Sequence, residues 1–230
     1  AYLGFTTAIG SMGLADGSLD DLHARLEMKP IGVLGELNGS ARTTSIDRSY
    51  LAGLGVRTAF HNDLPGSIVH QIVPEGPGLR PAAEILEELA RSDSAFQIAY
   101  VPDNDGDRGN LVFVSNSGTA EPLEAQQVFA LVVLGELAWL EHTGVLTYDD
   151  AGRPTTPTAV VVNGPTSLRI DRIADAFGAD VHRAEVGEAN VVGLAAELRG
   201  KGYLVRVLGE GSNGGNITYP ATVRDPINTL

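Results

Sequence analysis

The stretch Ile98-Ala-Tyr-Val-Pro-Asp103-Asn-Asp105-Gly-Asp107-Arg108-Gly109 indicates both the fold and the chemistry of this chain. An apolar segment typical of a buried strand runs directly into three aspartates at alternate positions, and an arginine follows at once. Alternate residues of an extended or gently curved segment point the same way, so the pattern predicts three converging carboxylates. Only oxygen ligands are offered, which suits Mg²⁺ or Ca²⁺ better than zinc. A solvated Asp-Gly turn is the alternative.

Outward from this stretch, apolar strands alternate with amphipathic helices. Before the aspartates we expect strands at 31–37, 56–61 and 96–101 and helices at 44–54 and 82–91. After them we expect a short strand at 111–114 and a long helix at 123–142. This order is typical of a mostly parallel sheet covered by helices. Ligands collect at the carboxyl ends of such strands, which is where Asp103 falls.

A second alternating set follows a loop at 143–157 that is rich in glycine and proline. It comprises expected strands at 159–163, 180–184 and 203–208 and expected helices at 167–177 and 189–199. The sequence therefore predicts two consecutive α/β domains, residues 1–112 and 113–230, each a mixed, mostly parallel sheet with helices on its faces. The first 30 residues give weak signals, and we assign them no function.

Composition limits the kind of protein further. The net charge of −13 disfavours nucleic acid and anionic membranes as partners, since both need a basic surface. The absence of cysteine excludes disulfides and Cys-ligated zinc. No apolar run reaches the roughly 18 residues that span a bilayer. We find no signal region at the start of the chain, so a cytoplasmic location is expected.

Other loops also follow predicted strands. The turn Gly209-Glu210-Gly-Ser212-Asn213-Gly-Gly215 combines glycines with hydrogen-bonding groups suited to sugar hydroxyls, and a flexible hairpin turn is the alternative. It lacks the Lys-Ser/Thr of a P-loop. Val186-Gly187-Glu188 opens a helix, where free amides can meet an anion or simply form a tight connection. Ser117–Pro122 could grip a phosphate, since hydroxyls and amides precede a helix, or it could be a loop and helix N-cap. Arg80 could reach a phosphate or lie at the surface.

In chain order, these motifs resemble those of the α-D-phosphohexomutase superfamily, which includes phosphoglucomutases and phosphomannomutases. The motifs are Asp103 to Arg108, Val186 to Glu188, and Gly209 to Gly215; Arg224-Asp225-Pro226-Ile227 is similar to a stretch that follows the sugar loop in that family. The resemblance spans about Ile31 to Leu230 and corresponds to the two middle domains of a four-domain enzyme. It implies two partners: a hexose phosphate substrate and the missing N- and C-terminal domains of the same enzyme.

The resemblance also implies roles for single residues. Mg²⁺ would be the cofactor, held by Asp103, Asp105 and Asp107. Arg108 would support catalysis from beside the same phosphate. Glu210 and Ser212 would accept the sugar's 3- and 4-hydroxyls. The full set implied to bind substrate is Glu210, Ser212, Asn213 and Glu188.

The implied reaction interconverts hexose 1-phosphate and 6-phosphate through a phosphoserine and a bisphosphorylated sugar. The family's nucleophile loop, Thr-x-Ser-His-Asn-Pro, does not occur in this sequence, and no Arg-x-Ser-Gly-Thr-Glu-Pro loop follows the sugar motif. We therefore expect a central fragment of such an enzyme that is inactive alone.

Two other classes remain open. A haloacid-dehalogenase-type phosphatase would use Asp103 as nucleophile and Asp105 as acid/base, but it expects Thr or Val in place of Asp107 and a downstream lysine, of which Lys201 is the only one. A calcium-binding structural module is the non-enzymatic alternative. Its EF-hand form fails, since counting from Asp103 puts Arg108 and Val114 where Gly and Glu are needed.

Overall fold

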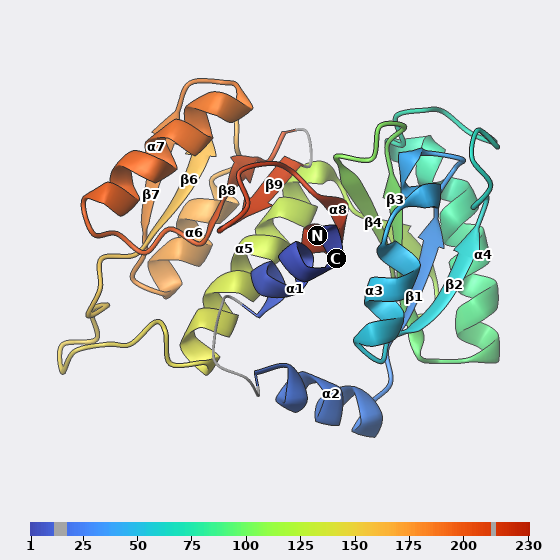
Figure 1. Cartoon of the computed structure of the whole chain (residues 1–230), viewed down its shortest axis with the longest axis horizontal. Helices are drawn as coiled ribbons and strands as arrows, with labels where there is room; N and C mark the ends of the chain where they lie inside the picture. Colours follow the sequence, from blue (N-terminus) through green and yellow to red (C-terminus); the bar gives the residue numbers. More distant parts are fainter. Residues whose placement is uncertain (12–17, 213–214) are drawn as a thin grey trace. The chain divides into compact units, whose positions relative to one another are not determined.

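The computed structural model describes residues 1–11, 18–212 and 215–230, and these form two compact units (Figure 1). The first unit is Ala1–Glu124 together with Leu230, and the second is Ala125–Thr229. Each contains a mixed sheet with helices packed on it. The predicted class of two consecutive α/β domains is therefore confirmed.

The first unit is built on a five-stranded sheet of order β2-β1-β3-β4-β5. The strands are β1 (Gly32–Glu36), β2 (Arg57–His61), β3 (Phe96–Pro102), β4 (Gly109–Val114) and β5 (Ala120–Pro122). The pairings of β1 with β2 and β3 are parallel, and those of β4 with β3 and β5 are antiparallel. The pairings of β1 are parallel because helices lie between these strands in the chain. The pairings of β4 are antiparallel because short connections join it to β3 and β5.

The helices of the first unit are α1 (Tyr2–Gly10), α2 (Ser18–Met28), α3 (Asp47–Gly53) and α4 (Arg80–Ser92), with short 3₁₀ helices at Ala41–Thr44 and Gly76–Leu79. Of these, α3 packs against β2 and α4 against β3. The chain steps from β1 to β2 in one direction and from β2 to β3 in the other, so right-handed crossovers place α3 and α4 on opposite faces. The α4 face carries the core, in which Leu86 packs with Leu34 and Val101.

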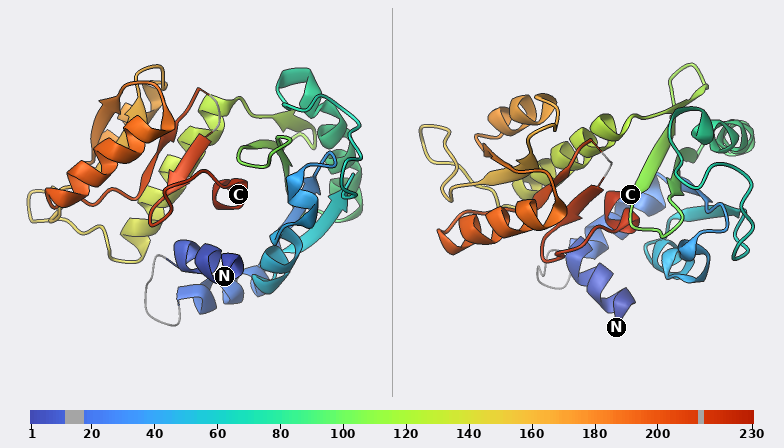
Figure 2. Two further views of the ribbon diagram at one scale, coloured as in Figure 1. Left: turned by 45° about the horizontal axis from the view of Figure 1, so that its top comes forward. Right: turned by 90° about the horizontal axis from the view of Figure 1, so that it is seen from above.

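The second unit has a four-stranded sheet of order β7-β6-β8-β9. Its strands are β6 (Ala159–Asn163), β7 (Asp180–Ala184), β8 (Val207–Glu210) and β9 (Gly215–Thr218). Its helices are α5 (Ala125–His142), α6 (Arg169–Ala176), α7 (Glu188–Gly200) and α8 (Pro226–Thr229). Among the described strands of this sheet, β8 and β9 pair antiparallel, and β6 pairs parallel with β7 and β8. Figure 2 shows α7 on one side of this sheet and α5 with α6 on the other.

Several predicted boundaries move. The expected strand at 203–208 begins only at Val207, because Leu204 makes an isolated bridge with Thr158. The long helix begins at Ala125, since residues 120–122 pair with β4 as β5. Ser117–Pro122 is thus a hairpin turn and strand, and the N-cap interpretation is wrong. The same pairing keeps β4 and β5 in the first unit, so the chain divides after Glu124 and not after residue 112.

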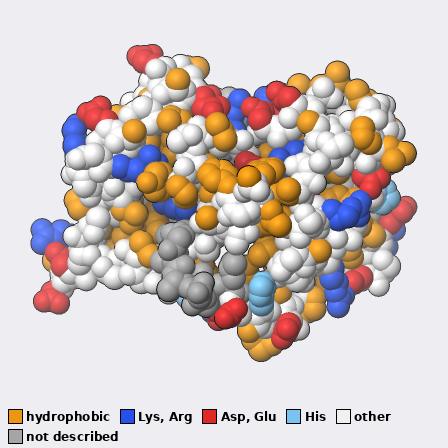
Figure 3. Space-filling model, in the orientation of Figure 1, with side chains coloured by type: hydrophobic (Ala, Val, Ile, Leu, Met, Phe, Trp, Pro, Cys, Tyr) orange, Lys and Arg blue, Asp and Glu red, His pale blue; other side chains and the backbone are white. Residues whose placement is uncertain are grey.

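The helices and the surface charges relate to what a membrane or a nucleic acid partner would need. Among the described helices, none is long and apolar enough to cross a membrane. Figure 3 shows acidic and basic side chains interspersed over the visible surface of each unit.

Candidate functional site

The aspartate loop, residues 103–108, is the hairpin turn that joins β3 to β4 at the carboxyl end of β3. It is closed by its own backbone: the Asp103 N–H donates to the Arg108 carbonyl (3.2 Å), and the Gly106 N–H donates to the Asp103 carbonyl (3.1 Å). Gly106 has a φ of +77°, a conformation that glycine adopts at little cost. The loop is a folded turn, so its shape differs from the extended segment assumed in the sequence argument.

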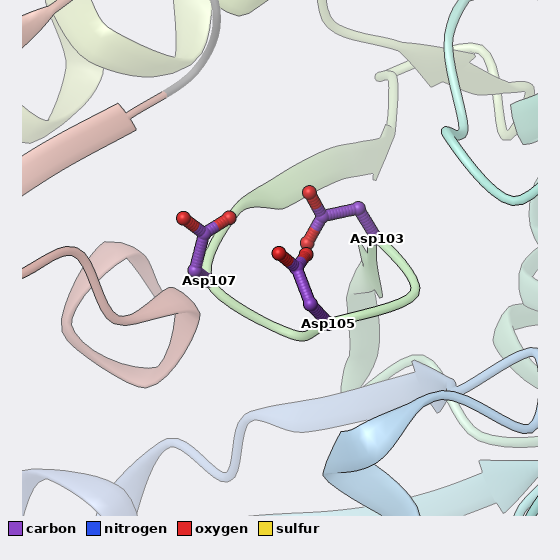
Figure 4. Close-up of side chains that lie close together, drawn as sticks. All are labelled: Asp103, Asp105 and Asp107. Atoms are coloured by element: carbon purple, nitrogen blue, oxygen red, sulfur yellow. The ribbon is translucent and has the colours of Figure 1, made fainter.

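The turn nevertheless brings the three carboxylates together, and they point toward one another in Figure 4. One oxygen from each of Asp103, Asp105 and Asp107 lies within 4.8 Å of the others. Asp103 is 2% exposed, Asp107 is half-buried and Asp105 is exposed. Asp103 is therefore part of the buried interior, whereas Asp105 is accessible to solvent.

Arg108 is bound to the innermost of these carboxylates. Its Nε donates to Asp103 Oδ2 (2.7 Å) and its backbone N–H donates to Asp103 Oδ1 (3.1 Å), while Asp107 Oδ1 lies 3.7 Å from Nε. Burial opposes the charge on Arg108, but the hydrogen bond to Asp103 and the charges of all three aspartates raise its pKa overall. Arg108 therefore stays a cation, fixed beside the cluster.

These residues fit a divalent metal. Three carboxylates beside one guanidinium form an oxygen-only donor set in which negative charge is in excess, and such a set suits a divalent cation. Opposite ligands around Mg²⁺ are about 4.2 Å apart, and around Ca²⁺ about 4.8 Å, so the spacing needs only small movements. Asp103 can accept from Arg108 and still ligate, since each carboxylate oxygen has two lone pairs.

The candidate loop of the second unit is the β8–β9 connection, which follows Glu210, the last residue of β8. Glu210 is 7% exposed, and its Oε1 accepts from Asn163 Nδ2 (2.9 Å) and from the Gly187 N–H (2.7 Å). The structure thus joins two motifs that the sequence presented separately, Val186–Glu188 and Gly209–Gly215. A buried carboxylate held by two donors is an oriented acceptor.

A hydrogen-bond chain fixes the backbone next to Glu210. The Gly211 N–H donates to Thr166 Oγ1 (3.0 Å), and Thr166 Oγ1 donates to Asn163 Oδ1 (2.6 Å). A Cβ on Gly211 would lie 2.6 Å from Gln126 Oε1, and one on Gly209 would lie 2.3 Å from the Gly215 carbonyl oxygen. Gly209 is therefore required by a close backbone contact, whereas the end of the Gln126 side chain could move away from a Cβ on residue 211.

The remaining predicted residues of this unit have different surroundings. Ser212 is exposed, whereas Asn213 lies outside the described residues. Glu188 begins α7 and is half-buried, with Oε2 2.8 Å from Arg224 Nε. This ion pair connects the Val186–Glu188 motif to the Arg224–Ile227 stretch, in which Asp225 Oδ1 accepts from the Ile227 N–H (3.0 Å).

Three other residues considered from the sequence are surface residues. Arg80 is exposed and pairs with Glu84 one turn later. The Ser117 hydroxyl bonds within its own turn, to Ser115 and Thr119. Lys201, the lysine required by the phosphatase alternative, is exposed and pairs with Glu197.

Sequence reasoning missed two buried polar networks in the first unit. One joins Glu36, at the end of β1, to His70 Nε2 (2.5 Å) and Asn62 Nδ2 (2.6 Å). A glutamate inside the apolar segment 31–37 was the available signal. The other network holds Arg42 against Asp47 (Nη2–Oδ1 2.5 Å), and the polar loop around Arg42 gave no signal.

Several solved structures share the fold of this chain. A proposed phosphomannomutase from Thermus thermophilus aligns over 99% of this chain with a TM-score of 0.67 and 17% identity. The Paramecium phosphoglucomutase parafusin, in an open form, aligns over 98% with a TM-score of 0.64 and 15% identity. The chain shares their fold. The expected resemblance to phosphohexomutases is thus confirmed at the level of structure.

A third solved structure bears on the ligands. N-acetylphosphoglucosamine mutase of Aspergillus fumigatus, in complex with GlcNAc-6P and magnesium, aligns over 93% of this chain with a TM-score of 0.55 and 13% identity. The chain spans less than half of these structures: 44% of the first, 36% of the second and 45% of the third. No protein-family model and no curated protein matches the sequence.

Proposed function

We propose that this chain is a central portion of an α-D-phosphohexomutase, in which its first unit binds Mg²⁺ and its second unit selects the sugar. The observation that carries the proposal is the aspartate loop: three carboxylates and Arg108 meet at the end of β3 in a fold shared with phosphohexomutases. Either feature alone is weak, because acidic turns are common and folds host many functions.

In this proposal Asp103, Asp105 and Asp107 hold the metal, which when bound offsets negative charge on the phosphoryl group being transferred. Asp103 is the fixed ligand because both its oxygens are held by Arg108. Asp105, being exposed, is the ligand that adjusts when the metal enters. Arg108 lies beside the same phosphate and contributes a second positive charge.

The second unit would recognise the sugar through Glu210 and Ser212. Glu210 Oε1 is held by Asn163 and Gly187, so the carboxylate has a fixed direction in which to accept hydroxyl protons. An oriented acceptor distinguishes hydroxyl positions more sharply than a mobile one. Glu188, paired with Arg224, would contribute at the start of α7.

Phosphoryl transfer in this family uses a serine nucleophile, for which this sequence contains no matching loop. We propose that the reaction passes through a phosphoserine and a bisphosphorylated hexose supplied with the remaining domains. Residues 1–230 by themselves are then expected to have no mutase activity.

The test begins with isothermal titration of Mg²⁺ into the chain and into Asp105→Asn. Asp63→Asn, a surface aspartate of the same unit that pairs with Arg48, is the matched control. We expect the parent and Asp63→Asn to bind Mg²⁺, and we expect Asp105→Asn to bind it with much lower affinity. Absence of Mg²⁺ binding by the parent would contradict the proposal.

A second measurement addresses the reaction class. The chain is incubated with glucose 1-phosphate and Mg²⁺, and both glucose 6-phosphate and free phosphate are assayed. We expect neither product. Glucose 6-phosphate formation would show that the fragment is active alone. Release of phosphate with a phosphoaspartate trapped at Asp103 would favour the phosphatase class instead.

A further inference from the structure

The side chain of Arg42 lies against the middle of the aspartate loop. A Cβ built on Gly106 would be 2.8 Å from Arg42 Cδ and 3.0 Å from Arg42 Cγ, so the aliphatic part of Arg42 touches the Gly106 backbone. The preceding residue also contacts the loop, because the Ala41 N–H donates to the Asn104 carbonyl (3.0 Å). Both contacts reach residues that separate the three aspartates.

Arg42 is itself fixed in place. Its Nε donates to Asp47 Oδ2 (3.0 Å), its Nη2 donates to Asp47 Oδ1 (2.5 Å), and its Nη1 donates to the Tyr2 hydroxyl (2.9 Å). The side chains of Arg42 and Asp47 are 8% and 2% exposed. A bidentate pair at this depth has little freedom, because separating it would break a buried, charge-assisted pair of hydrogen bonds.

Asp47 connects this pair back to the strand that delivers the ligands. The Tyr100 hydroxyl donates to Asp47 Oδ2 (2.8 Å), and Tyr100 is fully buried on β3, a few residues before Asp103. The contacts therefore form a closed path from β3 through Tyr100, Asp47 and Arg42 to Gly106, and the loop returns from Gly106 to β3. The loop is held at its base and at its middle.

We propose that Arg42 is a positioning residue for the metal site, and that the Arg42–Asp47–Tyr100 group sets the spacing of the three carboxylates before metal binds. This inference rests on the proposed function, since it assumes that the aspartates bind Mg²⁺. Arg42 is not a ligand. It acts through the backbone at Gly106, whose position determines where the exposed Asp105 and half-buried Asp107 point. Residues that support ligands in this way change metal affinity by about 10- to 100-fold when mutated.

The experiment is Mg²⁺ titration calorimetry on the full chain and its variants, with folding checked by circular dichroism. Arg42→Met removes one member of the buried ion pair, and Arg42→Met combined with Asp47→Leu removes both members. Arg48→Met is the control, because Arg48 forms an exposed ion pair in the same unit. We expect a Kd raised about 10-fold or more in the single and double variants. The control should bind as the parent does.

Tyr100→Phe provides a milder variant that keeps the ion pair and the ring packing. Loss of one hydrogen bond to Asp47 is expected to raise the Kd by about 2- to 10-fold. This variant decides the matter if both Arg42 variants fail to fold. Parent-like affinity in the folded double variant, or in Tyr100→Phe when that is the variant available, would overturn the inference. Failure of the parent itself to bind Mg²⁺ would instead refute the proposed function.

Discussion

Gly106→Ala tests whether the aspartate loop depends on its backbone conformation and on its contact with Arg42. Two effects follow from the structure. The φ of +77° costs an alanine about 1–2 kcal/mol relative to an allowed conformation. The new Cβ would also lie 2.8 Å from Arg42 Cδ, and Arg42 cannot swing aside because Asp47 and Tyr2 hold its guanidinium. We therefore expect a total loss of about 2–4 kcal/mol, the excess over the backbone cost being typical of overpacking.

The matched control is Gly118→Ala. Gly118 has a φ of +82° in the β4–β5 turn of the same unit, and an added Cβ would meet no atom within 4 Å, so this variant carries the backbone cost alone. Urea unfolding of parent and both variants gives the two free-energy losses, and Mg²⁺ titration gives the affinities. We expect weaker Mg²⁺ binding only in Gly106→Ala. Equal losses of stability in the two variants, together with parent-like Mg²⁺ binding in Gly106→Ala, would refute the reasoning.

Three further predictions concern the buried networks. Asp47→Asn breaks the buried ion pair with Arg42 and is expected to lower the free energy of unfolding by about 3–5 kcal/mol, measured in urea. Thr166→Val removes the acceptor of the Gly211 N–H and should cost about 1–3 kcal/mol by the same assay, while Mg²⁺ affinity stays unchanged. Burial, then the charge and hydrogen bond of Asp47, raise the pKa of Tyr100. Because the unfolded phenol then loses its proton first, the Tyr100 contribution is complete below about pH 10 and declines above it. The free energy of unfolding should therefore decrease more between pH 8.5 and pH 10.5 in the parent than in Tyr100→Phe.

The alternation of strands and helices could be predicted because it is a local pattern. Segments such as 159–163 and 180–184 are bounded by turns, and the structure has strands with these bounds. The short β5 and β9 could not be predicted, since each is defined by its antiparallel partner more than by its own residues. The division of the chain after Glu124 depends on the pairing of β5 with β4, so it could not be predicted without β5.

The candidate site shows the same limit. The sequence named the three aspartates and Arg108 because their spacing is visible in one segment, and the structure brings them together. It could not show that Glu210 is held by Asn163 and Gly187, which lie far from it in the sequence. Nor could it find Arg42, whose importance comes from a contact with Gly106 across the fold. The kinds of ligand side chain can be found in the sequence, whereas the contacts that hold them in place become visible only in the folded chain.

Anomalous diffraction from crystals of the chain soaked in Mn²⁺, an ion with the same preference for oxygen ligands as Mg²⁺, tests the central claim most directly. We expect a single strong peak in the aspartate loop, about 2.2 Å from one oxygen each of Asp103, Asp105 and Asp107, with Arg108 still bound to Asp103. A map without a peak there, or with Mn²⁺ bound only elsewhere on the chain, would contradict it.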